Sequence, residues 1–204
     1  MSAAHRITFL PVLALLLPAC HSFGPPSPQT LARLQPMPLA AAIAGRFELE
    51  LDGPGLAGTF DAVCALEGRS CRLQLFPDIG GKVFDLRLEE ASIAADGPWG
   101  HYEANAPLDS APPHLALALG AMLAELLAPV PATRVLGERQ TPDGRTQVSL
   151  RPALGSGAVT ATLGNSGEVE TYAIALGRIA FTLAADGSLR GRGLAGRLRF
   201  PGRG

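Results

Sequence analysis

Polar and apolar residues alternate along most of this 204-residue chain, beginning at Gly45. In the segment 46–53 ("RFELELDG"), Phe47, Leu49 and Leu51 occupy every second position, with acidic residues between them. Side chains two apart on a strand point to the same face of a sheet, so this spacing predicts strands with one buried and one exposed face. The alternation recurs in several later segments, which favours an antiparallel sheet.

A single segment, 110–131 ("SAPPHLALALGAMLAELLAPVP"), breaks this alternation and predicts a helix. Asp109 or Ser110 is expected to cap it, with Pro112 and Pro113 in its first turn, and Pro129 and Pro131 are expected to end it. Its apolar residues leave almost no polar side. Such a helix must be covered on most sides or must close over something apolar.

Strands, one long apolar helix and then more strands predict an α+β domain with an antiparallel sheet. After the helix we expect a hairpin about residues 142–144, followed by three or four strands with turns at 164–167 and 186–187. The predicted organisation is a signal peptide at 1–19, a lipid-bearing cysteine and proline-rich tether at 20–42, and one domain at 43–204. A short helical turn is expected within the tether at 30–34.

The apolar run Ile7–Ala19 is 13 residues long and follows a single Arg6. It is too short to cross a bilayer, which takes about 20 residues, and it fits a secretory signal. The end of this run, together with the residue that follows it, reads Leu17-Pro18-Ala19-Cys20 and resembles the lipobox of bacterial lipoproteins. That resemblance implies cleavage before Cys20, acylation of Cys20, and, because His21 is not aspartate, an outer-membrane location facing the periplasm. The alternative is an ordinary signal peptide beside a free thiol.

Two further cysteines, Cys64 and Cys71, lie in a predicted hairpin, and export would favour a disulfide between them. A turn centred on Glu67-Gly68 would place them directly opposite each other. A turn centred on Gly68-Arg69 would make them diagonal neighbours and strain the bond. Two buried free thiols are the alternative.

The sequence offers little for catalysis or nucleic-acid binding. The net charge is −1, which favours no nucleic-acid partner. Neither His101 nor His114 has an evident partner in a nucleophilic arrangement, and 164–168 ("GNSGE") lacks the final glycine of a nucleophile elbow. We therefore expect no enzyme activity, no cofactor and no metal site; an envelope hydrolase is a remote alternative.

The order of segments is similar to that of the outer-membrane lipoprotein carrier and receptor family of the periplasmic Lol system. The resemblance rests on the strand 45–51 ("GRFELEL"), the turn segment 75–86 ("LFPDIGGKVFDL"), the apolar helix and the second set of strands. It implies a half-open β-barrel covered by the helix, with an apolar cavity for acyl chains. It also implies that Ile79, between Pro77 and Gly80, is a protruding apolar residue. The residues expected to line the cavity are Phe47, Leu49, Leu51, Phe60, Leu73, Leu75, Phe84, Leu86, Leu88, Leu115, Leu119, Met122 and Leu126.

Two interpretations of the interior remain, a filled core or a hollow site that opens when the helix lifts. The first hypothesis for function is a lipid-anchored protein that receives acyl chains of lipids or lipoproteins. The second is a structural or assembly lipoprotein of a larger envelope complex that binds no lipid.

Overall fold

The computed structural model describes residues 22–41, 43, 45–67, 70–90, 92–105, 114–128, 130, 132–192 and 194–199. The expected signal peptide and Cys20 lie outside the described residues. Within that part of the chain, no helix is both long enough and apolar enough to span a membrane.

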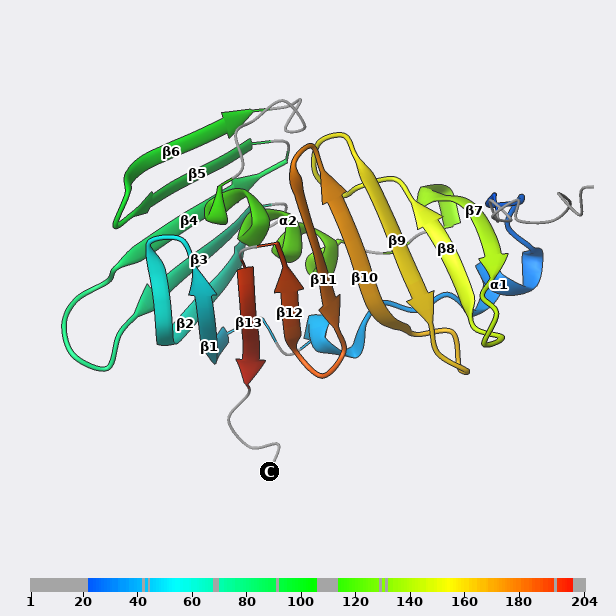
Figure 1. Cartoon of the computed structure of the whole chain (residues 1–204), viewed down its shortest axis with the longest axis horizontal. Helices are drawn as coiled ribbons and strands as arrows, with labels where there is room; N and C mark the ends of the chain where they lie inside the picture. The colour runs from blue at the N-terminus through cyan, green and yellow to red at the C-terminus, as the bar shows by residue number, and fades with distance from the viewer. Residues whose placement is uncertain are drawn as a thin grey trace, which may run out of the picture.

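The described residues form one antiparallel sheet and two α-helices (Figure 1). The helices are α1 (Pro28–Arg33) and α2 (Leu115–Leu127), with short 3-10 turns η1 (Pro38–Ala41) and η3 (Ala132–Arg134). The sheet has 13 strands. They are β1 (Gly45–Gly53), β2 (Leu56–Glu67), β3 (Ser70–Phe76), β4 (Phe84–Glu89), β5 (Ser92–Gly97), β6 (Gly100–Asn105), β7 (Val135–Gln140), β8 (Thr146–Leu150), β9 (Ala158–Leu163), β10 (Val169–Leu176), β11 (Ile179–Ala184), β12 (Ser188–Gly191) and β13 (Leu194–Arg199).

The strand order is β6-β5-β4-β3-β2-β1-β13-β12-β11-β10-β9-β8-β7. The first and last strands therefore pair at the centre of the sheet, and β6 and β7 form its two edges. The sheet is curved and does not close on itself (Figure 1). Because α2 joins β6 to β7, it carries the chain from one edge of the sheet to the other, and Figure 1 shows it lying across the face between the two halves. The predicted α+β class with an antiparallel sheet is confirmed at this level.

Helix α2 begins later than predicted. Its N-cap is His114, whose Nδ1 accepts a hydrogen bond from the Ala116 N–H at 3.1 Å. The predicted cap at Asp109 or Ser110 is wrong. The predicted place of Pro112 and Pro113 in the first turn concerns residues outside the described part of the chain. The helix ends as predicted: a residue that precedes a proline is biased away from helical conformation, and Ala128, which precedes Pro129, is extended.

The segment after α2 contains more strands than expected. Residues 158–199 form the five strands β9 to β13, where three or four were predicted. The additional strand is β12, which has four residues and is separated from β13 by only two. Leu189 is the only large apolar side chain of these four residues, so they carry too little of the alternating pattern to be recognised as a separate strand. The predicted hairpin turn at 142–144 is confirmed between β7 and β8.

Residues 22–41 are not a free tether, although the sequence predicted one. Gly24 and Glu138 of β7 exchange two backbone hydrogen bonds of 2.8 Å. Further along, the Gln35 N–H donates to the Gly167 carbonyl at 2.9 Å, and Met37 is 1% exposed within the core. We call residues 22–41 the N-terminal strap. The predicted short helix within it is present as α1, capped by the Ser27 hydroxyl.

Candidate apolar site beneath helix α2

Every residue of α2 from Leu115 to Leu126 is buried. The helix approaches the sheet closely at Gly120, where an added Cβ would lie 2.5 Å from Cδ1 of Ile93 in β5. At its start, Leu115 lies against β1, since a Cβ on Gly53 would be 3.3 Å from Leu115 Cδ1. Helix α2 is thus held against both the centre and one flank of the sheet.

The structure brings together all the residues predicted to line an acyl-chain cavity. They belong to one hydrophobic cluster that combines one face of the sheet with α2, and they are at most 6% exposed. A cavity large enough for an acyl chain would leave accessible area on the side chains that line it. In this structure the predicted cavity residues form a packed interface, and an acyl chain would have to replace α2 to contact them.

The last turn of α2 carries a buried charge, Glu125, which is 2% exposed. One carboxylate oxygen accepts from the Arg134 guanidinium at 2.5 Å, and the other accepts from the Ala153 N–H at 2.5 Å. Arg134 also donates to the Arg151 carbonyl. Burial, reinforced by the nearby Glu125 charge, raises the pKa of the Tyr172 hydroxyl. The two hydrogen bonds of Glu125 fasten the end of α2 to η3, which precedes β7, and to the segment that follows β8.

The start of α2 meets a group of aromatic rings. His114 stacks on Tyr102 with ring centroids 4.1 Å apart, and it lies edge-on to Trp99 at 4.6 Å. Burial lowers the pKa of His114, and its Nδ1 accepts the capping bond, so the neutral ring is favoured. Within the described part of the chain, the buried Nε1 of Trp99 and hydroxyl of Tyr102 have no hydrogen-bond partner. Both groups can donate to a bound acceptor.

The two cysteines are close but are present as thiols. Their Sγ atoms lie 3.1 Å apart, and both side chains are buried. Cys64 pairs with Leu73, and Leu66 pairs with Cys71, so the cysteines are diagonal neighbours. This register corresponds to the turn centred on residues 68–69, and the directly opposite arrangement is not formed. The hydrogen bond with Cys64, together with burial, raises the pKa of the Cys71 thiol.

Ile79 is 92% exposed in the loop between β3 and β4, which projects from one end of the molecule in Figure 1. The base of this loop is tied to the sheet. The Val83 N–H donates to the Leu75 carbonyl at 3.0 Å, and Lys82 Nζ donates to Asp85 at 2.5 Å. The structure therefore presents Ile79 to solvent on an anchored loop.

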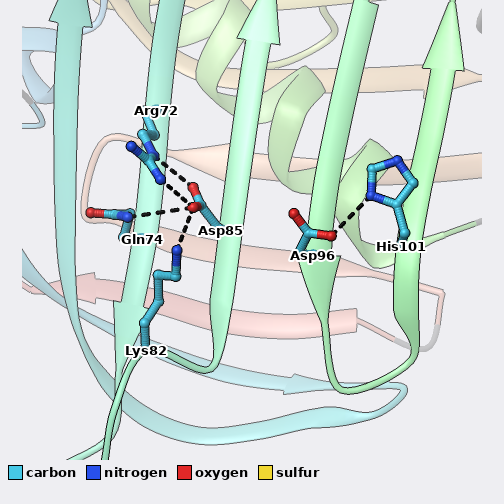
Figure 2. Close-up of polar contacts among 6 residues, drawn as sticks. All are labelled: Arg72, Gln74, Lys82, Asp85, Asp96 and His101. Carbon is cyan, nitrogen blue, oxygen red and sulfur yellow. Dashed lines mark hydrogen bonds and ion pairs between the residues drawn. The ribbon is translucent and has the colours of Figure 1, made fainter.

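Asp85 lies on the face of β4 opposite the core but is only 3% exposed, because basic side chains cover it. Figure 2 shows Arg72, Gln74 and Lys82 converging on its carboxylate. Arg72 donates through both Nε, at 2.8 Å, and Nη2. These bonds, chiefly the one from Arg72, hold the pKa of Asp85 well below its ordinary value.

A second polar pair lies beside this one on the same face. Asp96 of β5 is opposite Asp85, and His101 of β6 is opposite Asp96. His101 Nδ1 lies 2.9 Å from Asp96 Oδ1 (Figure 2), and this contact raises the pKa of His101. Both side chains are more than half exposed, and among the described residues no three His, Cys, Asp or Glu side chains form a possible metal site.

Sequence reasoning missed the roles of Glu125, Asp85 and the aromatic group at His114. A lone glutamate inside an otherwise apolar helix was a usable signal, because a buried charge requires a partner. Asp85 gave no such signal, since it occupies a position of the alternating pattern where a polar residue is expected. The contacts of His114 depend on the approach of β6 to the helix.

Comparison with known proteins adds no assignment to this geometry. No protein-family model matches the chain, and no curated protein matches it significantly in sequence.

Proposed function

We propose that this protein is a lipid-anchored lipoprotein of the bacterial outer membrane that binds acyl chains of lipids or lipoproteins between α2 and the sheet. In this proposal the curved sheet acts as a half-open barrel and α2 is its lid. The carrying observation is α2 itself, an almost entirely apolar helix that lies against β4, β5 and β11 between the two halves of the sheet and is buried from Leu115 to Leu126. No catalytic step, cofactor or metal is part of the proposal.

Because α2 already covers the apolar face of the sheet, an acyl chain can bind there only by displacing the helix, not by entering an empty cavity. Lifting α2 exposes the apolar faces of helix and sheet at about 25 cal/mol per Å². Each acyl methylene that then enters returns about 0.8 kcal/mol. Because the two apolar surfaces are chemically alike, a chain of ordinary fatty-acid length can offset much of the cost of displacing the helix.

The polar contacts of α2 lie near its two ends, which suits a lid. Near one end is the Glu125–Arg134 pair, and at the other is the His114 cap beside Trp99 and Tyr102. The free donors of Trp99 and Tyr102 could bind the ester carbonyl of an acyl lipid once α2 moves. Acyl chains would thus be held by apolar contact and oriented by two hydrogen bonds.

A reversible lock on α2 tests the proposal. A Cβ at Gly120 would lie 3.1 and 3.5 Å from Ile93 Cγ1 and Cγ2, so cysteines at these two positions can form a disulfide. The variant Ile93→Cys/Gly120→Cys would be made in a soluble form that starts at Ser22 and carries Cys64→Ala and Cys71→Ala. Binding of a fluorescent fatty acid would then be measured with and without reductant. We expect binding only when the lock is reduced, with the unmodified Ile93/Gly120 protein insensitive to reductant.

The burial of the predicted cavity residues also favours a second candidate, a scaffold that binds no lipid. Mass spectrometry of lipid extracted from the soluble form separates the two. Stoichiometric acyl lipid supports the carrier. Lipid-free protein that also fails to bind the fluorescent fatty acid in the reduced form supports the scaffold.

Ile79 is proposed to act in transfer of the acyl chain rather than in folding. Ile79→Glu should slow transfer of a fluorescent diacylated peptide from donor vesicles to the protein, while leaving the unfolding transition unchanged because the side chain is 92% exposed. Leu66→Glu is the matched control, since Leu66 is a second exposed large apolar residue, at 43%. Equal transfer rates for the two variants would contradict a specific role for Ile79.

A further inference from the structure

The N-terminal strap reaches β7 within a few residues of Cys20, the proposed site of lipid attachment. Gly24 pairs with Glu138 through two backbone hydrogen bonds of 2.8 Å, which extend the sheet beyond its edge strand. The Ser27 hydroxyl also donates to the Glu138 carboxylate at 3.3 Å. The described chain therefore starts on one identifiable edge of the sheet.

The local sequence of β7 is suited to this contact. A Cβ at Gly137 would lie 2.7 Å from the Gly24 carbonyl oxygen and 2.9 Å from Phe23 Cβ, so only glycine allows the strap to approach this closely. The Arg139 guanidinium lies over the Phe23 ring, 4.6 Å from its centroid. The strap is thus held from its first residues by backbone, cation–π and side-chain contacts.

Chain length then limits where a lipid on Cys20 can be. Four residue steps separate Cys20 from Gly24, and an extended chain spans at most about 3.6 Å per residue, or roughly 14 Å. A bilayer that holds the acyl chains of Cys20 must consequently lie within about that distance of β7. The same edge carries Leu136, one of the few exposed large apolar residues, at 57%.

We infer that the β7 edge, with Phe23 and Leu136, is the surface that rests on the membrane; this inference rests on the lipid anchor of the proposed function. The loop that bears Ile79 and the start of the strap lie at opposite ends of the long axis in Figure 1. Seating β7 on the bilayer therefore directs the Ile79 loop away from the anchoring membrane, towards incoming ligands.

Site-specific fluorescence tests this orientation in the full-length, lipidated protein. Leu136→Cys and Glu103→Cys would each be labelled with an environment-sensitive dye, since Cys64 and Cys71 are buried and Glu103, on the opposite edge strand, is 60% exposed. The proteins would be reconstituted in phosphatidylethanolamine/phosphatidylglycerol vesicles with headgroup-labelled quencher lipid. We expect loss of fluorescence at position 136 and little loss at position 103.

A variant that detaches the N-terminal strap from β7 provides a second test in the same quenching experiment. Gly137→Val should displace the strap, lengthen the path to Cys20 and reduce quenching at position 136, without reducing the amount of protein on the vesicles. Equal quenching at 136 and 103, or quenching at 136 that is unaffected by Gly137→Val, overturns the inference. Failure of the protein to join the vesicles overturns the anchor as well, while fatty-acid binding by the soluble form is measured independently and can still succeed.

Discussion

Asp85 and Glu125 are the two charged side chains buried among the described residues, and they stabilise different parts of the molecule. Glu125 is enclosed by protein, and its partner Arg134 is only 12% exposed. Asp85 is covered by Arg72 and Lys82, which are 43% and 38% exposed. Removing one partner of a buried pair leaves a charge that water cannot solvate, so we expect the larger effect at Glu125.

Glu125→Leu should lower the free energy of unfolding by about 3 kcal/mol, because it strands the Arg134 charge. The double variant Glu125→Leu/Arg134→Met removes both charges and should recover part of that loss. Urea denaturation of the parent, Glu125→Leu, Arg134→Met and the double variant measures these effects. If the double variant is as unstable as the sum of the single changes, the pair is not coupled as the geometry requires.

Asp85→Asn should lower stability at neutral pH by about 1–2 kcal/mol, since the carboxylate accepts charge-assisted bonds from partly exposed partners. Its folded pKa lies below the ordinary 3.8, so the unfolded chain takes up the proton first as pH falls. The stabilisation is therefore present above about pH 4 and is lost as pH falls towards the folded pKa. Unfolding at about pH 7 and pH 3 should show a difference between parent and variant that shrinks in acid; a constant difference would contradict this assignment.

At the scale of elements, the distance between α2 and the sheet decides how tightly the helix covers it, and the register of the β2–β3 hairpin decides how its two cysteines face each other. Gly120 lets α2 lie directly on Ile93, which makes the helix a tightly fitted cover. In the hairpin, the pairing of Glu67 with Ser70 sets Cys64 and Cys71 as diagonal neighbours. One residue of register decides whether a cross-strand disulfide forms without strain.

Oxidation of the hairpin should join Cys64 to Cys71 slowly, because both side chains are buried and an oxidant in solution reaches them poorly. Closing so short a loop stabilises a chain by about 2.5 kcal/mol in the chain-entropy treatment, and diagonal strain should reduce this gain. Thiol counting by mass spectrometry, followed by denaturation with and without reductant, tests both statements. Two thiols persisting after prolonged oxidation would favour the free-thiol alternative.

At the scale of the whole molecule, pairing of β1 with β13 joins the two ends of the domain at the centre of the sheet. The two halves then extend outwards, and α2 links their far edges. The strap runs from the β7 edge to the β9–β10 turn, so residues that read as a linker become part of the core.

Met37→Ala should therefore cost about 2–4 kcal/mol, the range for truncating a buried large side chain. Gln29→Ala, at an exposed position of the same strap, is the control and should change stability little. Thermal or urea unfolding of the soluble form starting at Ser22 measures both. If Met37→Ala is silent, the strap does not contribute to the folded core in solution.

The sequence by itself determined the antiparallel sheet, the single apolar helix and its stop before Pro129. Each of these depends on residue periodicity or on local backbone chemistry, which act within a few residues. Only the tertiary structure decided that residues 22–41 are docked, that Glu125 meets Arg134, and that β1 pairs with β13. These contacts join residues far apart in the chain or on separate elements, and their energy depends on how the whole sheet curves around α2.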